Sequence, residues 1–151
     1  MIVYFIRHGE TDFNKRCLIQ GMSDIPLNDK GIQQAGNAAE WFEKQNITFD
    51  RVFASPVVRA RKTAAIVSGR TFEEVQPDAR IREMDFGVDE GKPYSLIKDL
   101  FDTPESYIPP EGAESIEELQ TRAQEFLDML SEMAASDESV HTVLAASHGA
   151  A

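Results

Sequence analysis

Apolar residues along this chain gather into short continuous runs separated by longer segments of helical period. Residues 2–6 (IVYFI) form a continuous β-branched and aromatic run, which predicts a parallel strand covered on both faces. Further strands are expected at 49–55 (FDRVFAS) and 141–147 (HTVLAAS), and a third extended piece around 79–87 (ARIREMDFG). These elements predict a sheet of several strands.

Segments of helical period lie between the predicted strands. Residues 26–45 carry Ile32, Ala35, Ala39 and Phe42 near helical spacing, with Asn28 or Asp29 as the expected N-cap. A second helix is expected over 56–69, with Ser55 as N-cap and Gly69 as the residue that ends it.

A capping box, Ser115 with Glu118, predicts the start of a third long helix. The segment 87–113 is loop-like, with a short helix expected over 94–101. Because strands and helices alternate, the predicted fold class is α/β: a mainly parallel sheet flanked by helices on both faces. One domain is expected over residues 1–151, since neither an internal repeat nor a linker interrupts the sequence.

Composition limits the possible partners and location. The 151 residues carry a net charge of −11, which disfavours nucleic acid and acidic membrane surfaces as partners. No apolar run approaches the roughly 20 residues of a membrane span, and residues 1–6 lack the basic lead of a signal peptide. A single cysteine, Cys17, excludes an internal disulfide and favours a reducing, cytoplasmic compartment. Composition leaves the oligomeric state open.

Charged and polar side chains follow the predicted strands where those strands end. In open α/β sheets ligands bind beyond the carboxyl ends of the strands. We therefore expect four segments distant in sequence to converge there: Arg7–His8, Ser55–Arg59, Glu83 and Ser147–His148.

These residue types suit the transfer of a phosphoryl group. The guanidinium forks of Arg7 and Arg59 match phosphate oxygens. His8 and His148 could attack phosphorus or hold charge, and Glu83 could protonate a leaving oxygen. Taken singly, each has an ordinary structural explanation: an arginine at a strand end is usually a surface charge, and Glu83 beside Arg82 would suit a surface ion-pair cluster.

Taken together, the motifs resemble the histidine phosphatase superfamily, the phosphoglycerate mutase-like group. The matching stretches are RHGETDFN, QG at 20–21, SPVVRARKTA, REMDFG, PPEGAES and SHG, and they occur in the order that the family shows. The resemblance implies that His8 is the phosphorylated nucleophile, that Arg7 and Arg59 bind phosphate, and that His148 completes the phosphate pocket. By the same resemblance Glu83 is the proton donor. The implied substrate-binding residues are Asn14, Gln20, Gly21 and Gly149.

The resemblance leaves three functions open. Mutases of the family carry a long basic insertion after the acidic motif, whereas residues 84–113 here are short and acidic, with Lys92 and Lys98 as their cations. A phosphatase acting on a small phosphorylated metabolite is therefore favoured over a mutase, and over a non-catalytic phosphate- or partner-binding domain. Neither a cofactor nor a metal is implied, since the spacing of histidines and acids does not match metal motifs. Asp89 stands where phosphatase-like relatives often have tryptophan, so the sequence does not indicate which ester is used.

Relatives in the resembled family continue past SHG with a further helix and strand, whereas this sequence ends at Ala151. We therefore expect the chain to be a fragment, a truncated form or a natural short form. His148 is expected to lie in a frayed terminus where side chains are poorly held.

Overall fold

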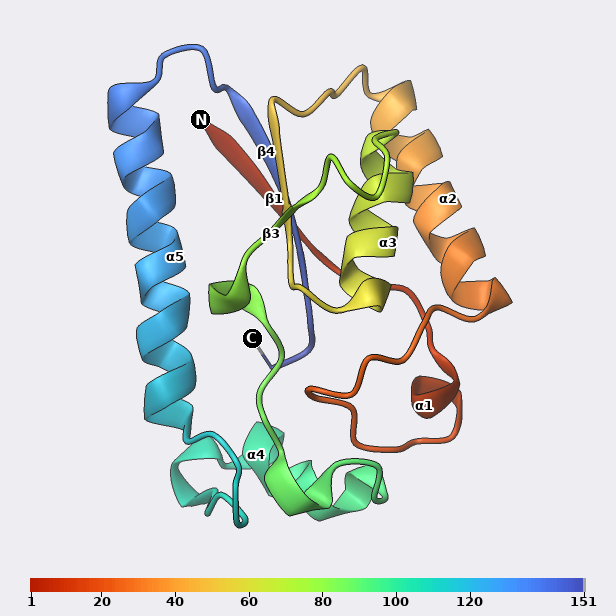
Figure 1. The fold of residues 1–151 in the computed structure, drawn as a ribbon, viewed down its shortest axis with the longest axis vertical. Helices are drawn as coiled ribbons and strands as arrows, with labels where there is room; N and C mark the ends of the chain where they lie inside the picture. The colour runs from red at the N-terminus through yellow and green to blue at the C-terminus, as the bar shows by residue number, and fades with distance from the viewer. Residues whose placement is uncertain (151) are drawn as a thin grey trace.

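The sheet of this protein is entirely parallel. A computed structural model describes residues 1–150, and Figure 1 shows its ribbon. The strands lie in the order β1 (Ile2–Arg7), β4 (Thr142–Ser147), β2 (Arg51–Ala54), β3 (Gln76–Pro77). Three of the predicted strands are confirmed. The third extended piece, predicted around 79–87, was misplaced. The strand there is β3, which has only two residues and precedes the predicted segment, and the first residues of that segment form the 3-10 turn η1 (Ala79–Ile81).

Helices cover both faces of the sheet, as predicted. In Figure 1, α2 (Asp29–Lys44) and α3 (Val58–Ser68) lie together on one side of the strands, and α5 (Ile116–Ser136) lies on the other. The Asn28 side chain caps α2 by accepting from the backbone N–H of Gly31, and the predicted capping box opens α5. Gly69 ends α3 in the left-handed conformation, with φ 69°.

The predicted N-cap of α3 was wrong. Its N-cap is Val57, whose side chain accepts no hydrogen bond there. The first N–H of the helix, on Val58, instead donates to the Asp24 carboxylate at 2.7 Å. A loop distant in sequence therefore supplies the cap, which local pattern could not reveal.

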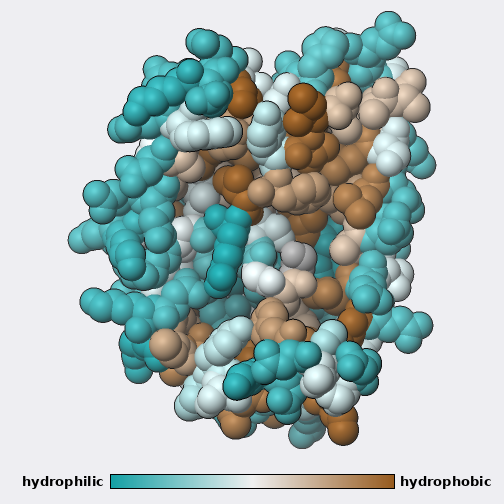
Figure 2. All heavy atoms as spheres, turned by 180° about the vertical axis from the view of Figure 1, so that it is seen from behind, coloured by the Kyte–Doolittle hydropathy of each residue, from teal (hydrophilic) through white to brown (hydrophobic). Residues whose placement is uncertain are grey.

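The two faces of the sheet carry separate cores. One packs side chains of β2, β4 and α3 with Phe42 of α2, and the other packs Phe126 and Leu130 of α5 against the opposite faces of β2 and β4. The central strand β4 is buried, but β1 is the edge strand, and Ile2 and Phe5 on it are 60% and 52% exposed. The expectation that residues 2–6 are covered on both faces is therefore wrong. Hydrophobic side chains reach the surface in the upper middle of the face seen in Figure 2.

Short helical turns gather at the carboxyl ends of the strands, in the lower half of Figure 1. They are α1 (Asp12–Lys15), η2 (Gly87–Asp89), η3 (Tyr94–Ile97), α4 (Lys98–Asp102) and η4 (Pro104–Ser106). The short helix predicted over 94–101 is confirmed as η3 followed by α4. Ile97 and Leu100 anchor this segment in a third core with Ile19, Met84 and Phe86.

Of the helices in residues 1–150, none has both the length and the apolar composition that crossing a membrane requires.

Candidate active site

The predicted convergence of distant segments is confirmed. Strands β1 and β4 pair in parallel with Arg7 opposite Ser147, so the residues that follow each strand emerge side by side. The backbone N–H of His8 donates to the Ser147 carbonyl at 3.0 Å. The His8 and His148 rings lie edge to face with centroids 5.1 Å apart. Two histidines 140 positions apart are thus neighbours because of strand pairing.

A pocket of about 280 Å³ opens beside His8. Its lining includes six of the nine predicted site residues: Arg7, His8, Asn14, Gln20, Glu83 and Gly149. Arg59, His148 and Gly21 do not line it, and the side chain of Arg59 has no exposed surface. The predicted set therefore divides into residues that face the pocket and residues that lie behind them.

The His8 ring is fixed in one tautomer. Its Nδ1 lies 2.7 Å from the carbonyl oxygen of Gly9, and because a carbonyl can only accept, the proton sits on Nδ1 and Nε2 keeps its lone pair. Burial, with help from the charges of Arg59 and Arg7, lowers the pKa of His8 to about 4. Near neutral pH the ring is therefore an uncharged base with a free Nε2. The N–H of Gly9 donates to the Thr63 hydroxyl at 3.1 Å, which ties this loop to α3.

Two amide side chains line the pocket with their oxygens already engaged. The Asn14 side-chain oxygen accepts from the Thr11 backbone N–H at 3.0 Å, and the Gln20 side-chain oxygen accepts from the Thr11 hydroxyl at 2.7 Å. Since both oxygens are held by Thr11, the NH₂ groups are the parts left to contact a ligand. Thr11 is fully buried, and the sequence reading did not identify it.

Arg59 is placed differently from what its predicted role suggests. We expected an open guanidinium fork, but NH1 donates to the Ser23 carbonyl and NH2 donates to the Gly21 carbonyl at 2.7 Å. Burial lowers the pKa of Arg59 to about 10, so it remains a cation near neutral pH. Its Nε is buried without a partner. In this structure Arg59 holds the 21–23 loop and adds positive charge behind His8.

Both peptide groups of Gly21 are engaged. Its N–H donates to the Glu90 carboxylate at 2.8 Å, and its carbonyl accepts from Arg59. Glu90 also accepts from the N–H of Ser23. The same loop is therefore held by Arg59 through its carbonyl groups and by Glu90 through its N–H groups. A Cβ on Gly21 would lie 2.3 Å from the Met84 carbonyl oxygen, which explains why only glycine fits. Gly21 thus shapes the site without offering a free donor, and Glu90 was missed from sequence.

His148 presents a buried N–H with nothing to receive it. Its Nδ1 lies 3.4 Å from NH2 of Arg59, which can only donate, so the proton sits on Nε2. That Nε2 is buried and has no partner. Burial and the charge of Arg59 lower the pKa of His148 to about 2. Buried polar atoms are nearly always paired, so this donor indicates a place for an acceptor beside His8.

Glu83 is buried, and the surface ion-pair explanation does not hold. Its carboxylate accepts from the backbone N–H groups of Met84 at 2.9 Å and of Gly149 at 3.1 Å, while Arg82 pairs with Glu114 instead. Burial raises the pKa of Glu83 above its usual range, against the opposing effect of those hydrogen bonds and of Arg59. A carboxyl whose pKa is raised by burial holds its proton to a higher pH than an exposed one, which suits a general acid.

The expected fraying at His148 was wrong. His148 is only 7% exposed, and Gly149 and Ala150 both donate backbone N–H groups to the Glu83 carboxylate. Gly149 also packs against Arg7, whose guanidinium carbon would lie 3.4 Å from a Cβ added there. These contacts hold the segment that follows β4 in place. They also engage the Gly149 N–H that had been expected to contact substrate.

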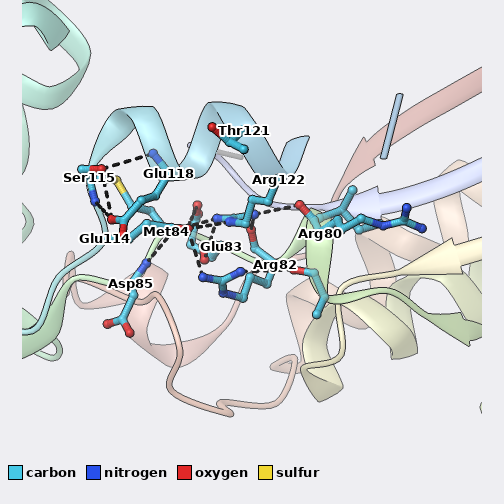
Figure 3. A network of polar contacts seen from close by, with 12 residues as sticks. Arg80, Arg82, Glu83, Met84, Asp85, Glu114, Ser115, Glu118, Thr121 and Arg122 are labelled. Carbon is cyan, nitrogen blue, oxygen red and sulfur yellow. Dashed lines mark hydrogen bonds and ion pairs between the residues drawn. The ribbon is translucent and has the colours of Figure 1, made fainter. Parts of the chain in front are cut away.

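Arg122 of α5 supports the backbone that carries Glu83 (Figure 3). It donates to the carbonyls of Arg80, Arg82 and Glu83 at 2.8, 2.7 and 3.2 Å. Its Nε and NH2 also bind the two oxygens of Glu114 at 2.6 and 2.8 Å. Burial acts to raise the pKa of Glu114, but its bonds with Arg122 lower it below the usual range. This buried pair positions the segment of Glu83 from behind.

Within residues 1–150, no group of three histidine, cysteine, aspartate or glutamate side chains lies close enough to hold a metal ion.

The rest of the pocket wall is apolar, and the sequence did not predict it. It consists of Leu18, Phe86, Tyr94, Ile97 and Phe101. The short apolar spacing of 94–101 predicted a helix but gave no sign of which side chains would face the pocket.

Comparisons with known proteins identify relatives of this chain. The chain is 35% identical over 144 residues to fructose-2,6-bisphosphatase TIGAR of Xenopus laevis, a match that covers 89% of this chain and 51% of the relative. It is also 35% identical over 157 residues to the probable phosphoglycerate mutase GpmB of Yersinia pestis, covering 99% of this chain and 70% of the relative. The chain thus spans about half the length of the TIGAR relatives that it matches.

Solved structures share the fold. The YhfR protein of Bacillus stearothermophilus superposes with a TM-score of 0.82 at 32% identity, over 98% of this chain and 74% of that one. A putative alpha-ribazole-5'-P phosphatase of Escherichia coli superposes with a TM-score of 0.80 at 30% identity, over 97% of this chain and 72% of that one. A sequence model of the histidine phosphatase superfamily (branch 1) matches residues 3–151. The chain therefore belongs to the histidine phosphatase superfamily.

Proposed function

We propose that this chain hydrolyses small phosphomonoesters through a phosphohistidine formed on His8. The observation that carries the proposal is the state of His8. It is a pocket-lining imidazole whose Nδ1–H is bound to the Gly9 carbonyl and whose pKa is lowered to about 4. An uncharged ring with a free Nε2 is a competent nucleophile at neutral pH.

The reaction has two balanced steps. The Nε2 lone pair of His8 attacks phosphorus, the P–O bond to the alcohol breaks, and the departing oxygen takes a proton from Glu83. Water then attacks phosphorus, Glu83 takes a proton from that water, and the N–P bond breaks to release inorganic phosphate and free His8. The raised pKa of Glu83 supports its alternation between acid and base.

Donors around the pocket support the binding of an oxyanion. Arg7, Asn14 and Gln20 line the pocket, and the two amides have their oxygens bound to Thr11, which leaves their NH₂ groups as donors. Donors aimed at the transferring phosphoryl group stabilise charge that develops in the transition state. The unpartnered Nε2–H of His148 would satisfy its hydrogen bond on the same anion. Arg59, which lies behind the pocket-lining residues, would contribute through its buried charge.

A mutase is the second candidate, because probable phosphoglycerate mutases are among the relatives. Mutase action requires retention of a second phosphate near the first. The two cations of residues 84–113 are already paired, Lys92 with Asp89 at 2.9 Å and Lys98 with Asp102 at 3.9 Å. That pairing supports hydrolysis. A non-catalytic phosphate-binding domain is the third candidate, and the state of His8 argues against it.

The partners and the cellular location of this protein remain predictions. A small anionic phosphorylated substrate follows from the proposal, while the net charge of −11 argues against nucleic acid as a partner. A cytoplasmic location is proposed from the single cysteine, which is exposed and unpaired.

Release of inorganic phosphate from a panel of phosphomonoesters tests the proposal. The wild-type chain should release phosphate from several esters, His8→Ala should release none, and His141→Ala should match wild type because that exposed histidine lies outside the site. Transfer of phosphate between two positions of a phosphoglycerate without release would identify a mutase. Binding of phosphate without turnover would identify the non-catalytic domain.

A further inference from the structure

The pocket beside His8 has two chemically distinct halves. Polar side chains form one half, and the other half is a wall of five apolar or aromatic residues. The members of this apolar wall are Leu18, Phe86, Tyr94, Ile97 and Phe101. A phosphoryl group bound at His8 would leave its ester substituent against this wall.

Two aromatic rings of the apolar wall are displayed to solvent. Tyr94 and Phe101 stack with ring centroids 5.8 Å apart and 27° between their planes. They are 43% and 45% exposed, although Phe86 and Ile97 beside them are almost fully buried. Large apolar side chains exposed at the rim of a polar pocket indicate a binding surface.

The apolar wall is held in place before any ligand arrives. The Tyr94 N–H donates to the Cys17 carbonyl at 2.9 Å, and Leu18 forms an isolated antiparallel β-bridge with Pro93. The two loops that supply the wall are therefore joined. Ile97 is 2% exposed within the core that also contains Leu100. A preformed surface gains more from contact with a ligand, because little ordering is required on binding.

Charge around the apolar wall disfavours a second anionic group. Among the pocket-lining residues of the described chain, Arg7 is the one cation. The nearby lysines are paired with Asp89 and Asp102. Burial raises the pKa of the Tyr94 hydroxyl, Arg7 acts to lower it, and Glu83 and Asp102 act to raise it. A second phosphate placed along the wall would therefore have to share Arg7, the cation that the first phosphate already uses.

We infer that the preferred substrates carry a single phosphate on an apolar or aromatic alcohol, which packs against Tyr94, Phe101 and Leu18. This inference rests on the proposed function, since it names the substrate class of the same site. The pocket volume of about 280 Å³ suits a small ester of this kind. Sugar bisphosphates and phosphoglycerates, which are polyanionic and strongly hydrated, are expected to be poor substrates.

A series of n-alkyl phosphates from ethyl to octyl tests this inference, because the leaving-group pKa is nearly constant along the series. Each methylene buried against the apolar wall should raise kcat/KM by up to about fourfold until the wall is covered. Fructose 2,6-bisphosphate and 3-phosphoglycerate should fall below hexyl phosphate in kcat/KM. A flat alkyl series, or a bisphosphate preferred over hexyl phosphate, would overturn the inference.

Variants locate the effect. Phe101→Ala and Tyr94→Ala should flatten the alkyl series, because each should raise KM for the longer esters more than it raises KM for ethyl phosphate. Ile108→Ala is the matched control, because Ile108 is 85% exposed but does not line the pocket. If kcat/KM still rises with alkyl length in both aromatic variants, the alkyl group binds elsewhere, and the inference that it packs on Tyr94 and Phe101 is contradicted.

The two proposals fail in different ways. If no ester, p-nitrophenyl phosphate included, releases phosphate, hydrolysis is excluded, while the affinity of n-alkyl phosphonates measured by calorimetry still tests the wall. Affinity that rises with chain length in wild type and not in Phe101→Ala supports the wall even then. If esters are hydrolysed with no dependence on chain length, hydrolysis stands and the substrate class is wrong.

Discussion

The rings of His8 and His148 meet edge to face with centroids 5.1 Å apart, and both are buried beside the Arg59 guanidinium. Burial and nearby cations lower the pKa of His8 to about 4 and that of His148 to about 2. Two adjacent imidazoles can share this space because neither is charged near neutral pH. One has a free lone pair and the other a free N–H, and the proposed attack on a phosphate ester uses the first as nucleophile and the second as donor to the phosphoryl group.

The first prediction concerns the acid limb of the pH profile. In the proposed mechanism His8 attacks as the uncharged ring, so kcat/KM should persist as pH falls through 6 and 5 and should decline only toward pH 4, where His8 takes a proton. The loss on the alkaline side should follow deprotonation of Glu83, at a pH above the usual glutamate range. The measurement is kcat/KM from pH 3.5 to 9. An acid limb near 6.5, the ordinary histidine value, would contradict the account.

The same shift makes a prediction for stability. The unfolded chain binds a proton at His8 near pH 6.5, whereas the folded chain does so only near 4. Between these values the unfolded state holds more protons, so the free energy of unfolding should fall as the pH drops through this window, by up to about 3 kcal/mol for this group. Urea unfolding at pH 7 and pH 4.5 measures the fall. His8→Asn should show a smaller fall, and an equal fall would show that other groups cause it.

A further prediction separates the acid role of Glu83 from a structural one. Glu83→Gln should reduce turnover of alkyl esters strongly and of p-nitrophenyl phosphate weakly, since nitrophenolate leaves without a proton. The measurement is kcat/KM across esters of rising leaving-group pKa. Glu43→Gln, on the exposed side of α2, is the matched control. A uniform loss across the esters would mean that Glu83 only anchors Gly149 and Ala150.

Arg59 should not tolerate lysine. Its guanidinium reaches the carbonyls of Ser23 and Gly21 at the same time, which a single ammonium cannot reproduce. A misplacement of about 1 Å in a site can cost on the order of 10²-fold in rate, and Arg59→Lys, which conserves the charge, should approach that loss by loosening the 21–23 loop. Arg61→Lys is a useful comparison, since Arg61 contacts Phe72 and Val75 away from the pocket. Full recovery by lysine at position 59 would mean that charge alone matters.

The sequence could predict most of the fold, because the strands at 2–7, 51–54 and 142–147 are apolar runs long enough to recognise. It could not predict β3, since Gln76 and Pro77 carry no apolar signal and pair only because β2 lies beside them. The motifs indicated His8 and Glu83, and the tendency of α/β sheets to bind ligands beyond the carboxyl ends of their strands predicted that the two residues would lie close together. The burial of Arg59 could not be predicted, because it depends on carbonyls from a loop distant in sequence.

The buried pair of Arg122 and Glu114 gives a test of the scaffold beneath Glu83. Arg122→Met removes the partner that binds both oxygens of buried Glu114 and leaves it only the partly exposed Arg82, and breaking a buried pair costs up to about 3–5 kcal/mol of stability. Arg122→Met combined with Glu114→Leu should regain part of that loss, because no buried charge is then left without its main partner. Chemical denaturation of the single and double variants measures both. A single variant as stable as wild type would show that the pair does not hold this segment.

The most direct test of the account is to trap the phosphorylated enzyme. Brief incubation with substrate, quenching without acid, and mapping by mass spectrometry and ³¹P NMR should find an acid-labile, base-stable phosphoryl group on His8. The attachment should be at Nε2, because the Gly9 carbonyl holds Nδ1. His8→Ala should carry no label, and His141→Ala should label as wild type does. A label on another residue, attachment at Nδ1, or full turnover by His8→Ala would contradict the mechanism.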